Sequence, residues 1–247
     1  MLFRSQRKPL EMLRLLIAQG GSGVSSKQLA HWLWPDAVGD AAQNSFDNAL
    51  HRLRKLLGDD RFVRHHDGAL TLDATLCWVD TRALEVCFAA SDTLLSGSSS
   101  NGNFDAYRSR DADRNLDANQ SLDAMASHVL ALYQGPFLRG DDSHPVILAA
   151  RDRLSSRFVR QLTAIASHHE RDGRWQRAAE LYLSLLEHNP LAEDTYRRLI
   201  RCHLHQGRPA EAFDAYRRCR DNLSIILGIK PSQETEQLLA RLRNDQV

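Results

Sequence analysis

Apolar side chains in the first part of the chain recur every three to four positions, the period of an α-helix. This spacing predicts a helix over 8–19. Ser25, followed three residues later by Gln28, has the form of a capping box, which opens a short second helix. A third helix is predicted over 41–57, and Gly58 follows it as a terminating residue.

The hydrophobic period changes after the third predicted helix. Segments 61–64 and 69–72 are short and β-prone, and His65-His66-Asp67-Gly68 stands between them as a turn. Asp-Gly between β-prone residues is a strong local hairpin signal. Three helices followed by a hairpin are the outline of a winged helix-turn-helix.

The rest of the chain returns to helical spacing, with one interruption. Helices are predicted over 81–95 and 122–133, and a longer one over about 147–165. Between the first two, segment 96–120 is rich in Ser, Asn, Asp and Gly and nearly lacks aliphatic residues. Such a composition predicts a flexible insertion.

A repeat with a spacing of 34 residues follows. A small residue at a helix contact and an aromatic residue four positions later are typical of tetratricopeptide helices, whose period is about 34 residues. The matching pairs are Gly173 with Gly207, Ala178 with Ala212, and Tyr182 with Tyr216. We therefore predict a mainly α protein. A winged helix-turn-helix over 1–76 is followed by an α-helical, tetratricopeptide-like domain over 77–247.

The composition is that of an ordinary globular protein. Hydrophobic residues make up 43% of the 247 and charged residues 26%, which excludes disorder throughout. No run approaches the roughly 18 to 20 uncharged apolar residues of a membrane helix, so we expect no membrane partner. The four cysteines show no C-x-x-C spacing. We expect free thiols in a reducing cytoplasm.

The formal net charge of +1 hides an asymmetry along the chain. Residues 1–72 carry 10 Lys and Arg against 7 Asp and Glu, whereas residues 73–142 carry 5 against 11. A weakly basic N-terminal segment permits nucleic-acid binding without establishing it.

The two faces of the predicted third helix differ in chemistry. On a helical wheel one narrow arc is aliphatic and aromatic, and the opposite arc is polar, with Asp47 at its edge. In a major groove, Asn pairs with adenine, Arg pairs with guanine, and Lys neutralises phosphate. An ordinary solvated helix face remains the alternative. The candidate residues on the polar arc are Asn44, Asn48, His51, Arg52 and Lys55.

The predicted hairpin adds a second candidate surface. A basic wing reaches phosphates or the minor groove beside a recognition helix. The candidates on this wing are Arg61, Arg64, His65 and His66.

Motifs of catalysis and cofactor binding are missing from the sequence. There is no GxxxxGK[ST], GxGxxG or GxSxG. Adjacent histidines point about 100° apart on a helix, so the His-His pairs do not chelate a metal in the i,i+4 manner. We therefore expect no enzyme, no catalytic residue, no cofactor and no bound metal.

Two long stretches resemble a known family. LAHWLWPDAVGDAAQNSFDNALHRLRKLLGDDRFVRHHDGALTLD resembles the DNA-binding segment of bacterial transcriptional activators with a response-regulator-type winged helix, such as the antibiotic regulatory proteins of actinomycetes. From Cys77 onward the chain resembles their bacterial transcriptional activator domain (BTAD). The match is closest over ELYLSLLEHNPLAEDTYRRLIRCHLHQGRPAEAFDAYRRCRDNLSIILGIKPSQETEQLL.

This resemblance implies a transcription regulator, most simply an activator. It implies contacts to double-stranded promoter DNA through helix 41–57 and wing 61–69. It also implies RNA polymerase as a partner and side-by-side dimers on DNA. Whether the repeats bind a ligand, a protein or a second copy of the chain stays open.

The chain departs from the family pattern in two places. Members usually begin with a small antiparallel sheet, but only Met1-Leu2-Phe3-Arg4 precedes the first helix here. We therefore expect the C-terminal module of a larger regulator. The insertion over 96–120 is the second departure. The alternative function is a helical-repeat interaction module whose winged helix serves as a docking or structural unit.

Overall fold

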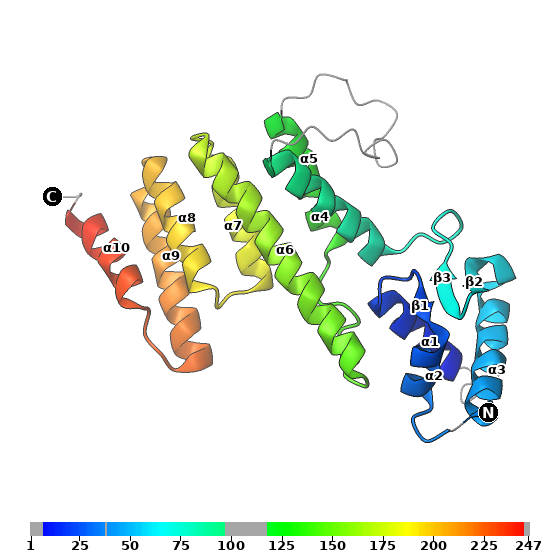
Figure 1. The fold of residues 1–247 in the computed structure, drawn as a ribbon. Helices are drawn as coiled ribbons and strands as arrows, with labels where there is room; N and C mark the ends of the chain where they lie inside the picture. Colours follow the sequence, from blue (N-terminus) through cyan, green and yellow to red (C-terminus); the bar gives the residue numbers. More distant parts are fainter. Residues whose placement is uncertain (1–6, 38, 97–117, 245–247) are drawn as a thin grey trace. The chain divides into compact units, whose positions relative to one another are not determined.

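The computed structural model describes residues 7–37, 39–96 and 118–244, and its elements are labelled in Figure 1. The fold is mainly α, a winged helix-turn-helix followed by tetratricopeptide-like helices, so the predicted fold class is confirmed. Most of the predicted insertion, 97–117, lies outside the described residues.

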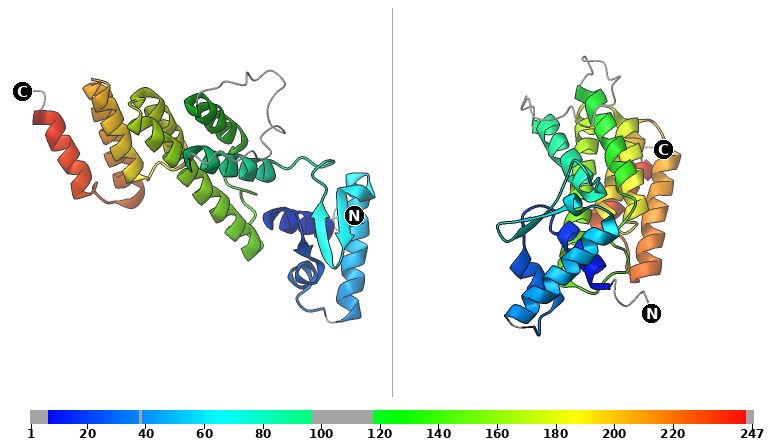
Figure 2. Two further views of the ribbon diagram at one scale, coloured as in Figure 1. Left: turned by 45° about the horizontal axis from the view of Figure 1, so that its top comes forward. Right: turned by 90° about the vertical axis from the view of Figure 1, so that its right-hand side faces the viewer.

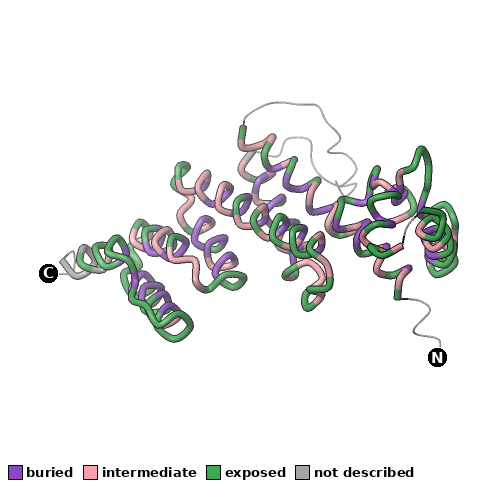
Figure 3. The backbone as a smooth tube through the Cα atoms, turned by 60° about the horizontal axis from the view of Figure 1, so that its bottom comes forward, coloured by how far each residue is buried: buried purple, intermediate pink, exposed green. Residues whose placement is uncertain are grey.

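Contacts divide the chain into two compact units. The first comprises Met1–Val86 and Gly135–Ser156, and the second Cys87–Gln134 and Arg157–Val247. Buried and exposed positions alternate along the helices of each unit (Figure 3). The domain boundary after residue 76 stays a prediction.

Three helices build the core of the first unit. They are α1 (Arg7–Ala18), α2 (Ser26–Leu33) and α3 (Asp40–Leu57). Each contributes its apolar stripe, because residues three and four apart share one helix face. The largest fully buried side chains of this core are Met12, Leu15, Leu16, Leu29, Leu33, Phe46, Leu53 and Leu70.

The ends of α2 and α3 follow the predicted capping chemistry. The Ser25 hydroxyl accepts a hydrogen bond from the Gln28 amide at 3.4 Å, which is one half of a capping box. Gly58 ends α3 with a left-handed φ of 90°, a conformation that side chains with a Cβ rarely adopt.

The hairpin is part of a three-stranded antiparallel sheet in the order β1-β3-β2. Its strands are β1 (Val24–Ser25), β2 (Val63–His66) and β3 (Ala69–Leu72). Asp67 and Gly68 both have positive φ, 50° and 71°, as a type I′ turn requires. Figure 2 shows the hairpin beside α3.

Two sequence predictions about this sheet need correction. The strand predicted over 61–64 begins only at Val63. The Asp59 carboxylate accepts a hydrogen bond from the Arg61 backbone amide, which holds Asp60–Phe62 in a 3-10 turn. His65 and His66 belong to β2 rather than to the turn, since a two-residue turn pairs His66 directly with Ala69. Strand β1 was not predicted, because two residues cannot display alternation.

Three helices lie between the hairpin and the repeats in the sequence. They are α4 (Asp80–Ser96), α5 (Ala118–Leu132) and α6 (Pro145–Arg171). Helix α5 begins four residues before the predicted start at 122, so the described end of the insertion is helical. Ile147 and Ala150 of α6 belong to the core of the first unit.

The second unit ends in the predicted repeats. They comprise α7 (Trp175–His188), α8 (Glu193–His205), α9 (Pro209–Asn222), a π-helical segment (Leu223–Leu227) and α10 (Gln233–Asn244). The aligned pairs occupy equivalent places. Ala178, Ala212 and Tyr182 are fully buried, and Tyr216 is 5% exposed.

The four cysteines are reduced in the structure. Cys77 is half-buried, Cys87, Cys202 and Cys219 are buried, and all four are free thiols. Among the helices described, none combines the length and apolar character needed to cross a membrane.

Candidate nucleic-acid interface

Helix α3 presents a continuous polar surface to solvent. Its members, which we call the polar face of α3, are all exposed: Asn44, Asn48, His51, Arg52 and Lys55. At about 100° and 1.5 Å per residue they fall within an arc of about 100° and extend along about 16 Å of the helix. The opposite side buries Phe46, Leu50 and Leu53, which fixes the orientation of the polar face.

An acidic side chain stands at the margin of the polar face. Asp47 lies one position before Asn48, and its carboxylate accepts a hydrogen bond from the Gln43 side-chain amide, Nε2, at 3.1 Å. This i,i+4 contact holds Asp47 toward the preceding turn of α3. The polar face therefore offers amide, imidazole and cationic groups, as direct base reading requires.

The predicted wing residues lie on and beside β2. Arg61, Arg64, His65 and His66 are all exposed. The His65 ring meets the buried Phe46 ring edge-on, with 5.7 Å between the centroids. This contact packs one wing histidine against the buried side of α3, so it fixes β2 on the helix but does not join the wing to the polar face on the opposite side.

Both wing arginines have carboxylate partners within the chain. Arg61 Nη2 lies 2.7 Å from Asp59 Oδ2, and Arg64 Nη2 lies 2.7 Å from Asp73 Oδ2. The hydrogen bond from Arg61 lowers the pKa of Asp59. Hydrogen bonds from Thr75 lower the pKa of Asp73, and the charge of Arg64 adds to this effect.

These ionised carboxylates change the electrostatics of the wing. A phosphate that approaches Arg61 or Arg64 competes with Asp59 or Asp73 for the guanidinium. The side chains of Arg61 and Arg64 are 76% and 63% exposed, so each can still reach a second anion. The wing is therefore less basic than its residue count indicates.

The wing is fastened to the helices by residues that the sequence analysis did not single out. Arg54 of α3 donates two hydrogen bonds to the Val63 carbonyl oxygen, from Nε at 3.0 Å and Nη2 at 2.8 Å. The Ser26 amide and hydroxyl both donate to the Gly68 oxygen, at 2.8 and 2.9 Å. These contacts join β2 to α3 and the hairpin turn to α2.

For one of these anchoring residues, Arg54, its position on the helical wheel could have indicated the role. On the wheel Arg54 lies between the polar face and the buried face, where a long side chain can reach a neighbouring element. The partner could not be predicted, because a backbone carbonyl carries no sequence signature. Among the described residues, no three His, Cys, Asp or Glu side chains come together in a way that could hold a metal ion.

Comparison with known proteins adds evidence about the family. The family model "Bacterial transcriptional activator domain" matches residues 103–243. A solved structure of Mycobacterium tuberculosis EmbR, in complex with a low affinity phosphopeptide, is similar with a TM-score of 0.61 and 22% identity. That alignment covers 96% of this chain and 59% of the EmbR chain, so this chain spans about 59% of the length of that protein. No curated protein sequence matches the chain.

Proposed function

The chain belongs to the bacterial transcriptional activator domain family, and on that premise we propose that it binds promoter DNA through its winged helix. This family consists of transcription regulators and is not an enzyme family. We place the direct readout on the polar face of α3 and backbone contacts on the wing over 61–69. Such a regulator acts on the chromosome, in the bacterial cytoplasm.

One observation carries this proposal. The polar face of α3 presents five exposed side chains that can pair with bases or phosphates, and a wing is fastened to the same helix through Arg54. An ordinary solvated helix face has no need of a wing fastened beside it. A major groove accepts a helix of this size, and the backbone beside it accepts a wing.

We assign the remaining functions by domain. Residues 1–76 form the DNA-binding domain, and residues 77–247 form the activator domain, which mediates dimer, RNA polymerase or signal contacts. This division follows the family resemblance and the 34-residue repeat.

A second candidate function rests on the electrostatics of the wing. Arg61 and Arg64 are already paired with Asp59 and Asp73, which weakens the basic character that phosphate binding needs. In this alternative the winged helix is a docking or structural unit of a helical-repeat interaction module.

Selection from a random pool of DNA duplexes separates the two functions. A DNA-reading regulator enriches one sequence motif over successive rounds at about 0.15 M salt, because base contacts discriminate by about 1 to 3 kcal/mol each. A docking module enriches none. Failure to enrich a motif would leave the second candidate function as the better account.

A further inference from the structure

Two turns in the repeats correspond residue for residue. The Arg174 amide donates to the His169 oxygen at 2.8 Å, and the Arg208 amide donates to the His203 oxygen at 2.9 Å. Gly173 and Gly207 adopt nearly the same left-handed φ, 71° and 68°. Because the backbones match at a spacing of 34 residues, the side chains of the two turns can be compared position by position.

An internal carboxylate fills the first turn. Asp123 of α5 accepts hydrogen bonds from Arg174 Nη2 at 2.6 Å and from Arg177 Nε at 2.8 Å. The Nε2 atom of the fully buried His169 lies 3.1 Å from the same carboxylate but is not in hydrogen-bond geometry with it. Burial alone would raise the pKa of Asp123, but the bonds from Arg177 and Arg174 outweigh it and lower that pKa.

The second turn keeps the basic groups, and its carboxylate, Glu211, acts on His203 through its charge without a hydrogen bond or ion pair to Arg208 among the described residues. Arg208, the counterpart of Arg174, is exposed and makes no side-chain hydrogen bond or ion pair within the described part of the chain. His203, the counterpart of His169, is 9% exposed, and its buried Nδ1 has no hydrogen-bond partner among the described residues.

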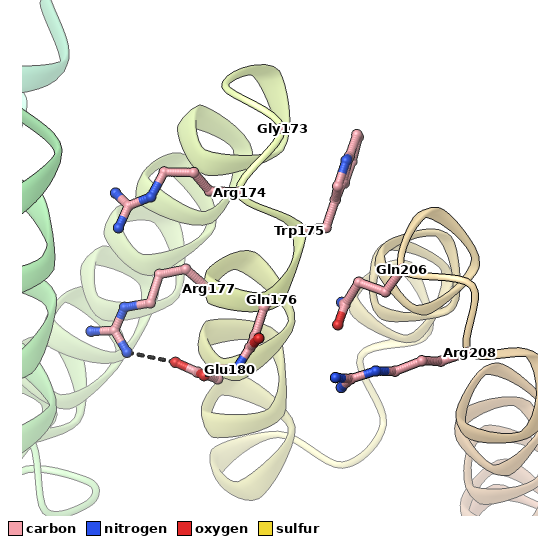
Figure 4. A pocket seen from close by; sticks show the side chains of 8 residues that line it. All are labelled: Gly173, Arg174, Trp175, Gln176, Arg177, Glu180, Gln206 and Arg208. Atoms are coloured by element: carbon pink, nitrogen blue, oxygen red, sulfur yellow. Dashed lines mark hydrogen bonds and ion pairs between the residues drawn. The ribbon is translucent and has the colours of Figure 1, made fainter.

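A pocket of about 550 Å³ lies between the two turns. The first turn and α7 line it with Gly173, Arg174, Trp175, Gln176, Arg177 and Glu180, and the second turn lines it with Gln206 and Arg208. In Figure 4 the side chains of Gln206 and Arg208 point toward α7, where Gln176 and Glu180 lie. Arg174 and Arg177 extend toward the other side of α7. Glu180 accepts a hydrogen bond from Arg177 Nη1 at 2.7 Å and makes no ion pair with Arg208 among the described residues.

We propose that this pocket binds a carboxylate ligand, whose carboxylate contacts Arg208 as Asp123 contacts Arg174. The amides of Gln176 and Gln206 line the pocket and offer further hydrogen bonds. Trp175, whose indole stacks on His205 with 3.9 Å between centroids, offers a flat surface to the body of the ligand. This site is separate from the DNA-binding function.

The local charges favour a single negative charge on the ligand. Arg208 is the guanidinium without a partner here, whereas Arg174 and Arg177 are neutralised by Asp123 and Glu180. Glu211 stands where the first turn has Arg177, at the same spacing of 34 residues. Glu180 and Glu211 would therefore repel a doubly charged phosphate more strongly than they repel a singly charged carboxylate.

Binding to the full chain can be measured by calorimetry with matched probes. One probe is N-acetylalanine, and another is a short Gly-Ser peptide with a free C-terminal carboxylate. The neutral control for each is its primary amide, and inorganic phosphate is the competing anion. Binding of either carboxylate but not its amide supports the site. Comparison of the two probes shows whether the ligand is a small acid or the C-terminal carboxylate of a peptide.

The variant Arg208→Gln is the decisive comparison. It should weaken carboxylate binding by about tenfold or more, because a charge-assisted contact is lost. Arg218→Gln removes the same charge from an exposed position of α9 outside the pocket and should bind like wild type. The proposal is overturned by unchanged binding in Arg208→Gln, by tighter binding of phosphate, by equal binding of the amides, or by no binding up to about 10 mM.

Discussion

At the scale of single residues, neighbouring cationic side chains of α3 make different contacts. Arg52 and Lys55 are exposed on the polar face, whereas Arg54 turns to β2 and donates twice to the Val63 oxygen. A helix rotates by about 100° per residue, so adjacent side chains meet different surroundings. The position on the helix, rather than the residue type, decides which cation faces solvent on the surface that we propose binds DNA.

The first prediction separates base contacts from phosphate contacts on α3. Arg52→Ala should cost about 1 to 3 kcal/mol of binding to the preferred sequence and relax the preference at one base pair. Lys55→Ala should weaken binding to all sequences and lower the salt slope by about one unit. Titrations of both variants over a salt series check this. If both bind like wild type, α3 is not the reading element.

The second prediction concerns the anchor of the wing. Arg54→Ala removes two hydrogen bonds and should lower the free energy of unfolding of the first unit by about 1 to 2 kcal/mol. Arg54→Lys keeps the charge but loses the forked geometry, so it should recover less than half of that loss. Denaturant unfolding measures both. A Lys variant as stable as wild type would show that the charge alone matters.

At the scale of elements, most of the fold could be predicted from the spacing of apolar residues. The predicted third helix over 41–57 differs from α3 by one residue at its start, because its stripe is regular and Gly58 ends it. The start of β2, the strand β1 and the anchors could not be predicted. Each depends on a contact distant in sequence, such as Val24 with Leu70.

The third prediction tests the alignment of the repeats. Ala178→Leu and Ala212→Leu should each lower the free energy of unfolding by about 1 to 3 kcal/mol, because both methyl groups are fully buried between helices. Ala210→Leu, at an exposed position of α9, should have little effect. Melting temperatures report the difference. Leu variants at 178 and 212 that melt like wild type would show that the alignment is wrong.

The fourth prediction is a pH dependence of the second unit. Burial lowers the pKa of both His169 and His203. Unfolding exposes the rings, which then take up protons below a pH of about 6.5, so the free energy of unfolding should fall between pH 7 and 5. In His203→Gln this fall should shrink, by at most about 1.4 kcal/mol per pH unit.

A control variant isolates the effect of the buried histidine. His128 of α5 is exposed, so His128→Gln should leave the pH dependence of stability unchanged. Denaturant unfolding at pH 7 and at pH 5 gives the comparison. A His203→Gln variant with the full pH dependence of wild type would contradict the role of burial.

At the scale of the whole molecule, the charge distribution and the family match both support the proposed division into an N-terminal DNA-binding domain and a C-terminal activator domain. Residues 1–72 are weakly basic and contain both candidate surfaces, whereas the BTAD family match covers 103–243. The helical wheel and the hairpin signal allowed the nine candidate residues to be proposed from the sequence; the structure leaves all nine exposed, and their contact with DNA stays a prediction. The carboxylates that pair with the wing could not be predicted, because ion pairs depend on the folded positions of flexible side chains.

The most direct test of the central claim is the affinity of the full chain for two duplexes of equal length and composition. One carries the motif enriched by selection, and the other carries the same bases in scrambled order. Binding isotherms are recorded between about 0.05 and 0.2 M salt. We predict a preference of about 10³ or more for the motif at the higher salt. Equal affinities for the two duplexes throughout the series would contradict sequence-specific DNA reading by this chain.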